Sequence, residues 1–131
     1  MARILVVDDR AVNRDLLSYL LSYFGHDVST ASDGAEAVCT ALAKHPDLIV
    51  MDIEMPGTDG YTAARLMRAE TALRDVPLIA VSAASMTLQQ AQAAGFDDYY
   101  PIPIEPRDFL ARLEPLLRRR APAGDGAGGK P

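Results

Sequence analysis

Four side chains able to bind a ligand or attack one stand directly after short apolar runs of the sequence. They are Asp8 and Asp9 after the run 4–7, Asp52 after the run 48–51, and Ser82 after the run 78–81. Open parallel sheets bind ligands outside the carboxyl ends of their strands. If these runs form neighbouring strands, three carboxylates therefore converge at one edge of a sheet.

A cluster of three carboxylates needs a compensating cation, because unneutralised charges within a few ångström repel strongly. The oxygen ligands have no His or Cys beside them in the sequence, and such a set suits Mg²⁺, which takes one or two carboxylates and keeps several waters. Taken singly, Asp8 or Asp9 also fits a simpler role, since Asp commonly caps a helix. The placement of these two and Asp52 at corresponding strand ends favours a Mg²⁺ site.

The remaining sequence alternates between apolar strands and amphipathic helices. Strands are predicted at 3–7, 27–31, 48–51, 78–81 and 98–102, and helices at 12–24, from 33, at 61–68, at 88–94 and from 106. Successive strand–helix units predict an α/β fold, a doubly wound (βα)5 three-layer sandwich with helices on both faces of a parallel sheet. Pro115 lacks a backbone donor and is expected to kink or fray the last helix.

Length and composition restrict the classes of function. A chain of 131 residues suits one domain, and hydrophobic and charged fractions of 49% and 24% are typical of a globular protein. The net charge of −5 argues against direct nucleic-acid binding, which needs a surplus of Lys and Arg. No apolar run approaches the ~20 residues of a membrane span and no signal peptide is recognisable, so we expect a cytoplasmic protein without a membrane partner. The single cysteine, Cys39, is expected to be a small buried side chain of the second helix.

Four motifs make the chain resemble the receiver domain of bacterial two-component response regulators. They are ILVVDD at Ile4–Asp9, LIVMDIEMPGTDG at Leu48–Gly60, VSA at Val81–Ala83 and AGFDDY at Ala94–Tyr99. The resemblance covers about residues 2–120 and implies a flavodoxin-like sheet with strand order 2-1-3-4-5. We therefore expect a receiver domain at 1–120, followed by a disordered tail or linker at 121–131, where Gly, Ala and Pro show no periodicity.

The resemblance also implies a role for each acidic residue. Asp52 matches the phosphoacceptor, which takes a phosphoryl group from a histidine kinase or a histidine phosphotransfer protein. Asp9 matches a direct ligand of Mg²⁺ and Asp8 a ligand acting through water. The backbone carbonyl of Glu54 matches the third protein ligand, beside Asp52 itself.

Two further residues match the machinery that transmits the signal. Ser82 matches the switch hydroxyl that bonds a phosphoryl oxygen, and Tyr99 matches the aromatic switch residue that turns inward when that hydroxyl moves. Family members usually signal through the face of the fourth helix, the fifth strand and the fifth helix. The partner there is a downstream protein that the sequence does not name, or a second copy of the chain in a homodimer. A short fourth helix, together with Pro101 and Pro115, is expected to reshape this face.

The chain departs from the family pattern near the end of the fifth strand. The family has a lysine before a proline there, whereas this chain has Ile102 before Pro103. Three carboxylates with one Mg²⁺ leave one net negative charge, which the lysine would have cancelled. Arg10 could supply the substitute charge by leaning toward the acidic pair, and the alternative is that its side chain points to solvent.

Three functions are compatible with these residues. A response regulator would act as a phosphoacceptor rather than a turnover enzyme, with at most slow self-dephosphorylation. A pseudo-receiver would use the fold as an interaction module independent of phosphorylation, because Ile102 replaces the lysine. An aspartyl-nucleophile phosphatase would use Asp52 as nucleophile and Glu54 as acid, but such enzymes place the nucleophile after the first strand and carry a larger cap. The sequence favours the first function.

Overall fold

The computed structural model describes residues 2–54, 60–82 and 87–120. Strands and helices alternate in the order β1 (Arg3–Val7), α1 (Ala11–Tyr23), β2 (Asp27–Ala31), α2 (Gly34–Lys44), β3 (Leu48–Asp52), α3 (Gly60–Ala69), the 3-10 helix η1 (Thr71–Leu73), β4 (Leu78–Ser82), α4 (Leu88–Ala93), β5 (Asp98–Pro101) and α5 (Pro106–Arg120). Each predicted strand and helix is present, with its bounds shifted by no more than one residue. The tail expected at 121–131 lies outside the described residues.

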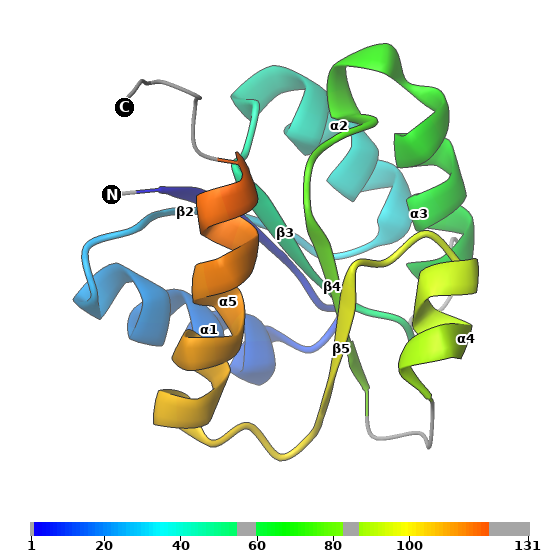
Figure 1. The fold of residues 1–131 in the computed structure, drawn as a ribbon. Coiled ribbons are helices and arrows are strands. Elements are labelled where there is room, and N and C mark those ends of the chain that lie inside the picture. The colour runs from blue at the N-terminus through cyan, green and yellow to red at the C-terminus, as the bar shows by residue number, and fades with distance from the viewer. Residues whose placement is uncertain (1, 55–59, 83–86, 121–131) are drawn as a thin grey trace.

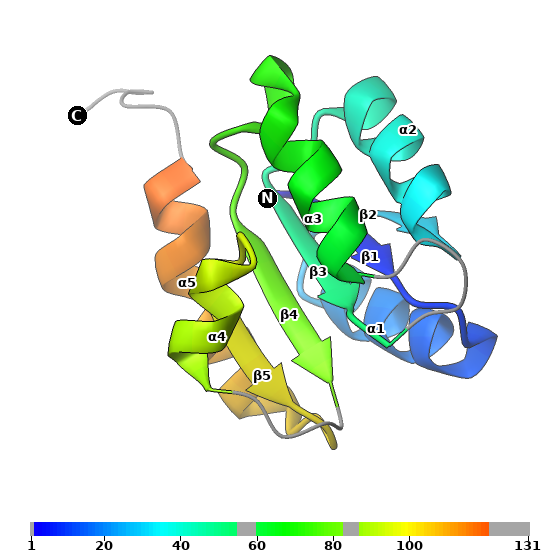
Figure 2. The ribbon, with the colours of Figure 1, turned by 90° about the vertical axis from the view of Figure 1, so that its right-hand side faces the viewer.

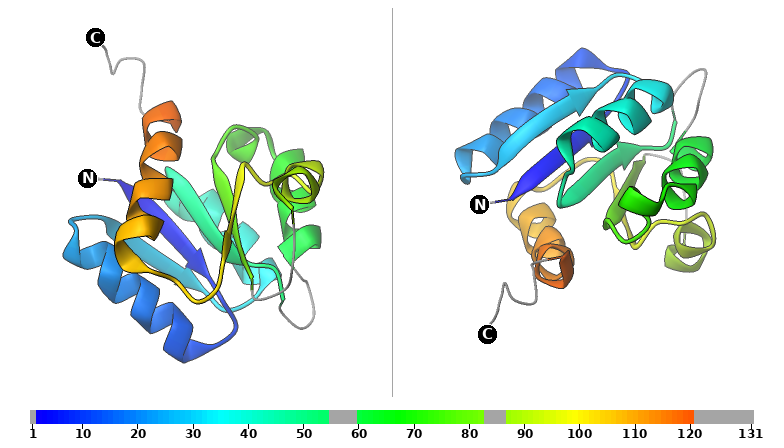
Figure 3. Two further views of the ribbon diagram at one scale, coloured as in Figure 1. Left: turned by 60° about the horizontal axis from the view of Figure 1, so that its bottom comes forward. Right: turned by 90° about the horizontal axis from the view of Figure 1, so that it is seen from above.

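The strands form one parallel sheet in the order β2-β1-β3-β4-β5, which confirms the doubly wound fold (Figure 1). The helices α1 and α5 cover one face, and α2, α3 and α4 cover the other (Figures 2 and 3). Every residue of the central strands β3 and β4 is buried, because both faces of the sheet are covered.

The alternation of side chains along each strand divides the interior into two cores. In β1, Leu5 and Val7 join the core beneath α2, α3 and α4, whereas Ile4 and Val6 join the core beneath α1 and α5. We call these the first core and the second core. Removing this apolar surface from water provides the main stabilisation of the fold, about 25 cal/mol per Å².

The helix α1 buries only part of its apolar surface. Leu17 and Leu21 are buried in the second core, but Val12 and Leu16 are 78% and 64% exposed. Its apolar residues occupy two adjoining stripes at helical spacing, and only one of these stripes faces the sheet. Periodicity alone does not distinguish the two stripes, because both satisfy the 3.6-residue repeat.

The expected burial of Cys39 is wrong, because the structure places this side chain on the exposed side of α2. Ala37 and Ala41 form the buried face of the helix. Cys39 is two residues from each of them, so it lies on the opposite side of a helix with 3.6 residues per turn.

The last helix continues beyond Pro115 to Arg120, so the expected fraying at the proline is not observed. Pro115 still lacks the donor that the helix ladder requires. Leu113 and Leu116, on either side of it, are both buried in the second core. Their packing holds this part of the helix against the sheet despite the missing hydrogen bond.

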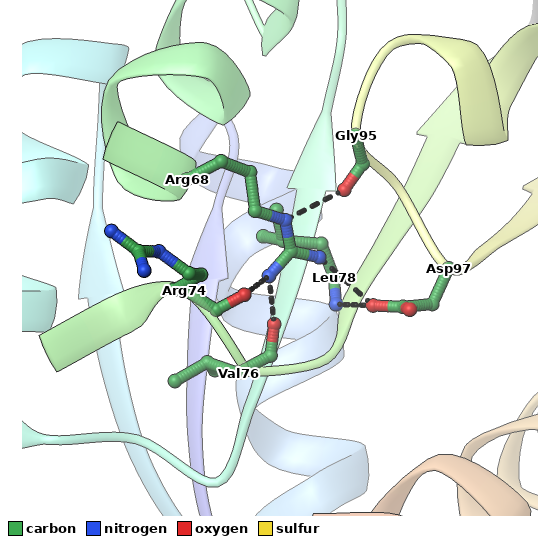
Figure 4. Close-up of polar contacts among 6 residues, drawn as sticks. All are labelled: Arg68, Arg74, Val76, Leu78, Gly95 and Asp97. Carbon is green, nitrogen blue, oxygen red and sulfur yellow. Dashed lines mark hydrogen bonds and ion pairs between the residues drawn. The ribbon is translucent and has the colours of Figure 1, made fainter. Parts of the chain in front are cut away.

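Arg68 of α3 joins three segments at the amino ends of β4 and β5 (Figure 4). Its Nη1 donates to the carbonyls of Arg74 and Val76 at 2.8 and 2.7 Å, and its Nε donates to the carbonyl of Gly95 at 2.9 Å. Its Nη2 forms an ion pair with Asp97 at 2.9 Å. We call this set of contacts the Arg68 bracket, and it lies at the sheet edge opposite the acidic residues.

Candidate functional site

The carboxyl ends of β1 and β3 bring the predicted acidic residues together. Val7 pairs with Met51, so the residues that follow them, Asp8 and Asp52, end neighbouring strands. Oxygen atoms of Asp8, Asp9 and Asp52 lie within 4.8 Å of one another. Asp8 and Asp52 are buried and Asp9 is exposed, so the cluster opens to solvent on one side.

The two buried carboxylates are anchored through one oxygen each. Oδ1 of Asp8 accepts from the backbone N–H of Arg10, and Oδ1 of Asp52 accepts from the backbone N–H of Glu54, both at 2.9 Å. Oδ2 of Asp52 is buried, and no donor among the described residues reaches it within hydrogen-bond distance. A buried anionic oxygen without a hydrogen bond is costly, so this atom marks a place for a ligand.

Burial raises the pKa of Asp52 from its ordinary 3.8 to about 6. The hydrogen bond from the backbone N–H of Glu54 lowers this pKa, and so does the positive charge of Arg10. The negative charges of Asp8 and Asp9 raise it further. The carboxyl is therefore largely ionised at neutral pH and can act as a nucleophile, but its charge is held at a cost. A cation that offsets this charge would bind favourably.

The donor set of the cluster fits Mg²⁺. It offers carboxylate oxygens only, and one of them, Oδ2 of Asp52, has no hydrogen bond from the described residues. Hard oxygen ligands of this kind, with an open side for water, suit a small divalent cation.

The predicted switch residues lie on the two strands beyond Asp52. Asp52 pairs with Val81, so Ser82, which is fully buried, stands one residue further along the neighbouring strand. The carbonyl of Ser82 accepts from the backbone N–H of Ile102 at 3.0 Å. Tyr99 is half-buried on β5 and packs against the first core.

Ile102 directs its side chain toward the second core rather than forming a charged contact. It lines a cavity of about 230 Å³ together with Asp8, Asn13, Leu16, Leu17, Val81, Pro103 and Ile104. The peptide bond between Ile102 and Pro103 is cis.

Arg10 leans toward the acidic cluster, although its side chain remains 59% exposed. Its guanidinium lies 3.9 Å from Oδ1 of Asp8 and 3.8 Å from Oδ2 of Asp52. With its amide oxygen facing this guanidinium, Asn13 accepts from both Nε and Nη2 at 3.1 Å.

Sequence reasoning missed Asn13 and Arg14 as parts of the site. Nη1 of Arg14 donates to the backbone carbonyl of Asp8 at 2.8 Å. The available signal was their spacing: Asn13 is three residues after Arg10, and residues three or four apart share one side of a helix.

The comparisons identify the class of protein that this fold and site define. The family model described as the response regulator receiver domain matches residues 4–114, and the chain belongs to that family. It is 40% identical over 119 residues to the probable transcriptional regulator ycf27 of Porphyridium aerugineum, covering 89% of this chain and 48% of that protein. It is 36% identical over 121 residues to the DNA-binding dual master transcriptional regulator RpaA of Synechocystis, covering 91% of this chain and 50% of that protein.

Among solved structures, the fold is similar to the receiver domain of sensor histidine kinase PA1611 from Pseudomonas aeruginosa. The TM-score is 0.83 at 32% identity, covering 89% of this chain and 98% of that one. That structure is described with a magnesium ion coordinated in its active site cleft.

The expectation of no direct nucleic-acid binding is contradicted by these relatives. RpaA is named a DNA-binding regulator, and the chain spans about half the length of the curated relatives it matches. The charge of −5 describes only these 131 residues, so it was no guide to what proteins of this kind bind. Within the described part of the chain, none of the helices combines the length and apolar character needed to cross a membrane.

Proposed function

We propose that the chain accepts a phosphoryl group on Asp52 from a histidine kinase or a histidine phosphotransfer protein, in the cytoplasm. The observation that carries this proposal is Oδ2 of Asp52, a buried carboxylate oxygen within a cluster of three acidic residues. This oxygen attacks the phosphorus of a phosphohistidine, and the bond from phosphorus to the imidazole nitrogen breaks. The electron pair stays on that nitrogen, and Asp52 becomes an acyl phosphate.

Mg²⁺ would be held by Asp9, Asp52 and the backbone carbonyl of Glu54, with Asp8 acting through water. It would supply charge compensation for the carboxylates and the phosphoryl oxygens. The chain's own residues position the reaction: the N–H of Glu54 fixes Oδ1 of Asp52, which leaves Oδ2 to attack.

Ser82 and Tyr99 would transmit the phosphorylated state. In this proposal the Ser82 hydroxyl donates to a phosphoryl oxygen and Tyr99 turns inward, which alters the face of α4, β5 and α5. On that face α4 has six residues and β5 ends at the exposed Pro101. The face would bind a downstream protein, with a second copy of the chain as the alternative.

An experiment with the wild-type chain separates this function from the two alternatives. The chain is incubated with Mg²⁺ and phosphoramidate, and its intact mass is followed together with the release of inorganic phosphate. We expect the mass of one phosphoryl group to be added, with at most slow release. No added mass would indicate a pseudo-receiver, and sustained release over many turnovers would indicate a phosphatase.

Mg²⁺ is expected to stabilise the fold, because it relieves repulsion that exists only when the three carboxylates are brought together. At about ten times its dissociation constant, the ion adds roughly 1.4 kcal/mol to the free energy of unfolding. The Tm should rise by about 4–7 °C. Asp9→Asn should remove most of this rise, whereas Asp75→Asn, at an exposed carboxylate remote from the cluster, should retain it. A rise of equal size with KCl at matched ionic strength would contradict a specific site.

A further inference from the structure

We propose that Arg10 supplies the phosphoryl group with the cationic contact that Ile102 cannot make. This inference rests on the proposed function of Asp52 as phosphoacceptor. It assigns a positively charged residue of the connection between β1 and α1 to the product, in place of a lysine following β5. The assignment follows from the position of Arg10, from what holds it there, and from the side chain opposite it.

The guanidinium of Arg10 already faces the oxygen that would attack. It lies 3.8 Å from Oδ2 of Asp52 and 3.9 Å from Oδ1 of Asp8. These separations are ion-pair distances but too long for hydrogen bonds, so the donors are not committed to either carboxylate. A group bound to Oδ2 of Asp52 would therefore meet a nearby cation with N–H groups to offer.

Asn13 keeps the guanidinium in this position. It stands on the first turn of α1, and with its amide oxygen facing the guanidinium it accepts from both Nε and Nη2 of Arg10 at 3.1 Å. The Arg10 side chain is 59% exposed, so it has room to move by the small distance that a phosphoryl oxygen would require. Asn13 is accordingly a positioning residue, which acts on the site through Arg10.

No comparable charge comes from the fifth strand. Ile102 packs against the second core and contributes an apolar wall beside Asp8. Within residues 2–54, 60–82 and 87–120, both ion pairs that reach the acidic cluster come from Arg10. Phosphorylation adds negative charge to an already acidic cluster. The electrostatic attraction between the cluster and the guanidinium of Arg10 would therefore increase.

The chemistry of arginine suits this role. Its guanidinium is planar and permanently charged, and it presents paired donors that match the oxygens of a phosphoryl group. Its hydrogen bonds to developing negative charge would be stronger in the transition state than to the free carboxylate. Arg10 would therefore increase the rate of uptake.

The test compares phosphoryl uptake in wild type, Arg10→Ala and the double variant Arg10→Ala with Ile102→Lys. Uptake from phosphoramidate is followed by intact mass, and Mg²⁺ affinity is measured separately by following backbone amide NMR signals during titration. Arg107→Ala removes the same charge from an exposed position on α5 and serves as the matched control.

Arg10→Ala should slow uptake about tenfold or more, the effect of losing charge-assisted contacts to the phosphoryl group. Ile102→Lys should restore much of the lost rate in the double variant, because the cation then approaches from β5. Mg²⁺ should bind Arg10→Ala at least as tightly as wild type, since a competing cation has been removed from beside Asp8 and Asp52. Arg107→Ala should match wild type in both measurements.

Several outcomes would overturn the inference. If Arg10→Ala takes up phosphoryl groups at the wild-type rate, Arg10 does not contact the phosphoryl group, although Asp52 remains the acceptor. If Arg10→Ala binds Mg²⁺ more weakly in proportion to its slower uptake, Arg10 acts on the metal site instead. If wild type itself gains no mass, the proposed function fails, and this inference fails with it.

Discussion

Asp52→Asn is expected to abolish phosphoryl uptake completely while raising the free energy of unfolding. Uptake is lost because the amide lacks the nucleophilic oxygen that forms the bond to phosphorus. Stability rises because the substitution removes a buried charge that faces Asp8 and Asp9. The shift of the Asp52 pKa from 3.8 to about 6 corresponds to a gain of about 1–3 kcal/mol near neutral pH without metal.

The two effects are measured separately, uptake by intact mass and stability by urea denaturation with EDTA present. Asp75→Asn is the control, since it removes an exposed carboxylate remote from the cluster and should change neither quantity. Ser82→Ala should retain part of the uptake, because its hydroxyl would only bond the product. A phosphoryl group found on another residue of Asp52→Asn would overturn the site assignment.

Arg68→Met is expected to lower the free energy of unfolding by about 2–4 kcal/mol, because it leaves several partners without a donor. The carbonyls of Val76 and Gly95 lose their hydrogen bonds from Arg68, and Asp97 loses its ion pair. Methionine preserves much of the apolar part of the Arg68 side chain, so the decrease in the free energy of unfolding measures the contribution of the guanidinium contacts.

Urea denaturation measures this loss, with Arg65→Met as the control on an exposed position of the same helix. Asp97→Asn should cost less than Arg68→Met, because an amide oxygen can still accept from the backbone N–H of Leu78, which donates to Asp97 at 2.9 Å. Equal losses in Arg68→Met and Arg65→Met would show that the Arg68 bracket contributes nothing specific.

The strands and the acidic residues at their ends were predictable because both depend on short-range patterns, whereas the strand order was implied by the resemblance to the receiver family. A solid apolar run such as 48–51 indicates a strand buried on both faces, and Asp52 follows directly from its end. Once the strand order is 2-1-3-4-5, the carboxyl ends of β1 and β3 must be adjacent, which brings Asp8 to Asp52.

Other features depend on the angle of a helix or on contacts between distant segments. The sequence does not reveal that Val12 and Leu16 lie outside the stripe that contacts the sheet. The sequence does not predict the hydrogen bond from Arg68 to Gly95. The acceptor is a backbone carbonyl, which every residue carries, so no residue type marks it. The sequence also left open where the Arg10 side chain points. Its position depends on contact with Asn13, and that contact is visible only once α1 is placed in the fold.

The Arg68 bracket fastens the amino ends of β4 and β5, whereas Ser82 and Pro101 stand at their far ends. The carboxyl ends are held by other contacts: β4 pairs with β3 and β5 as far as Ser82, whose carbonyl accepts from the backbone N–H of Ile102. Anchorage by Arg68 and the acidic cluster are therefore separated along the length of these strands. Changes to Arg68 should act on the stability of the fold and leave the geometry of the acidic residues unchanged.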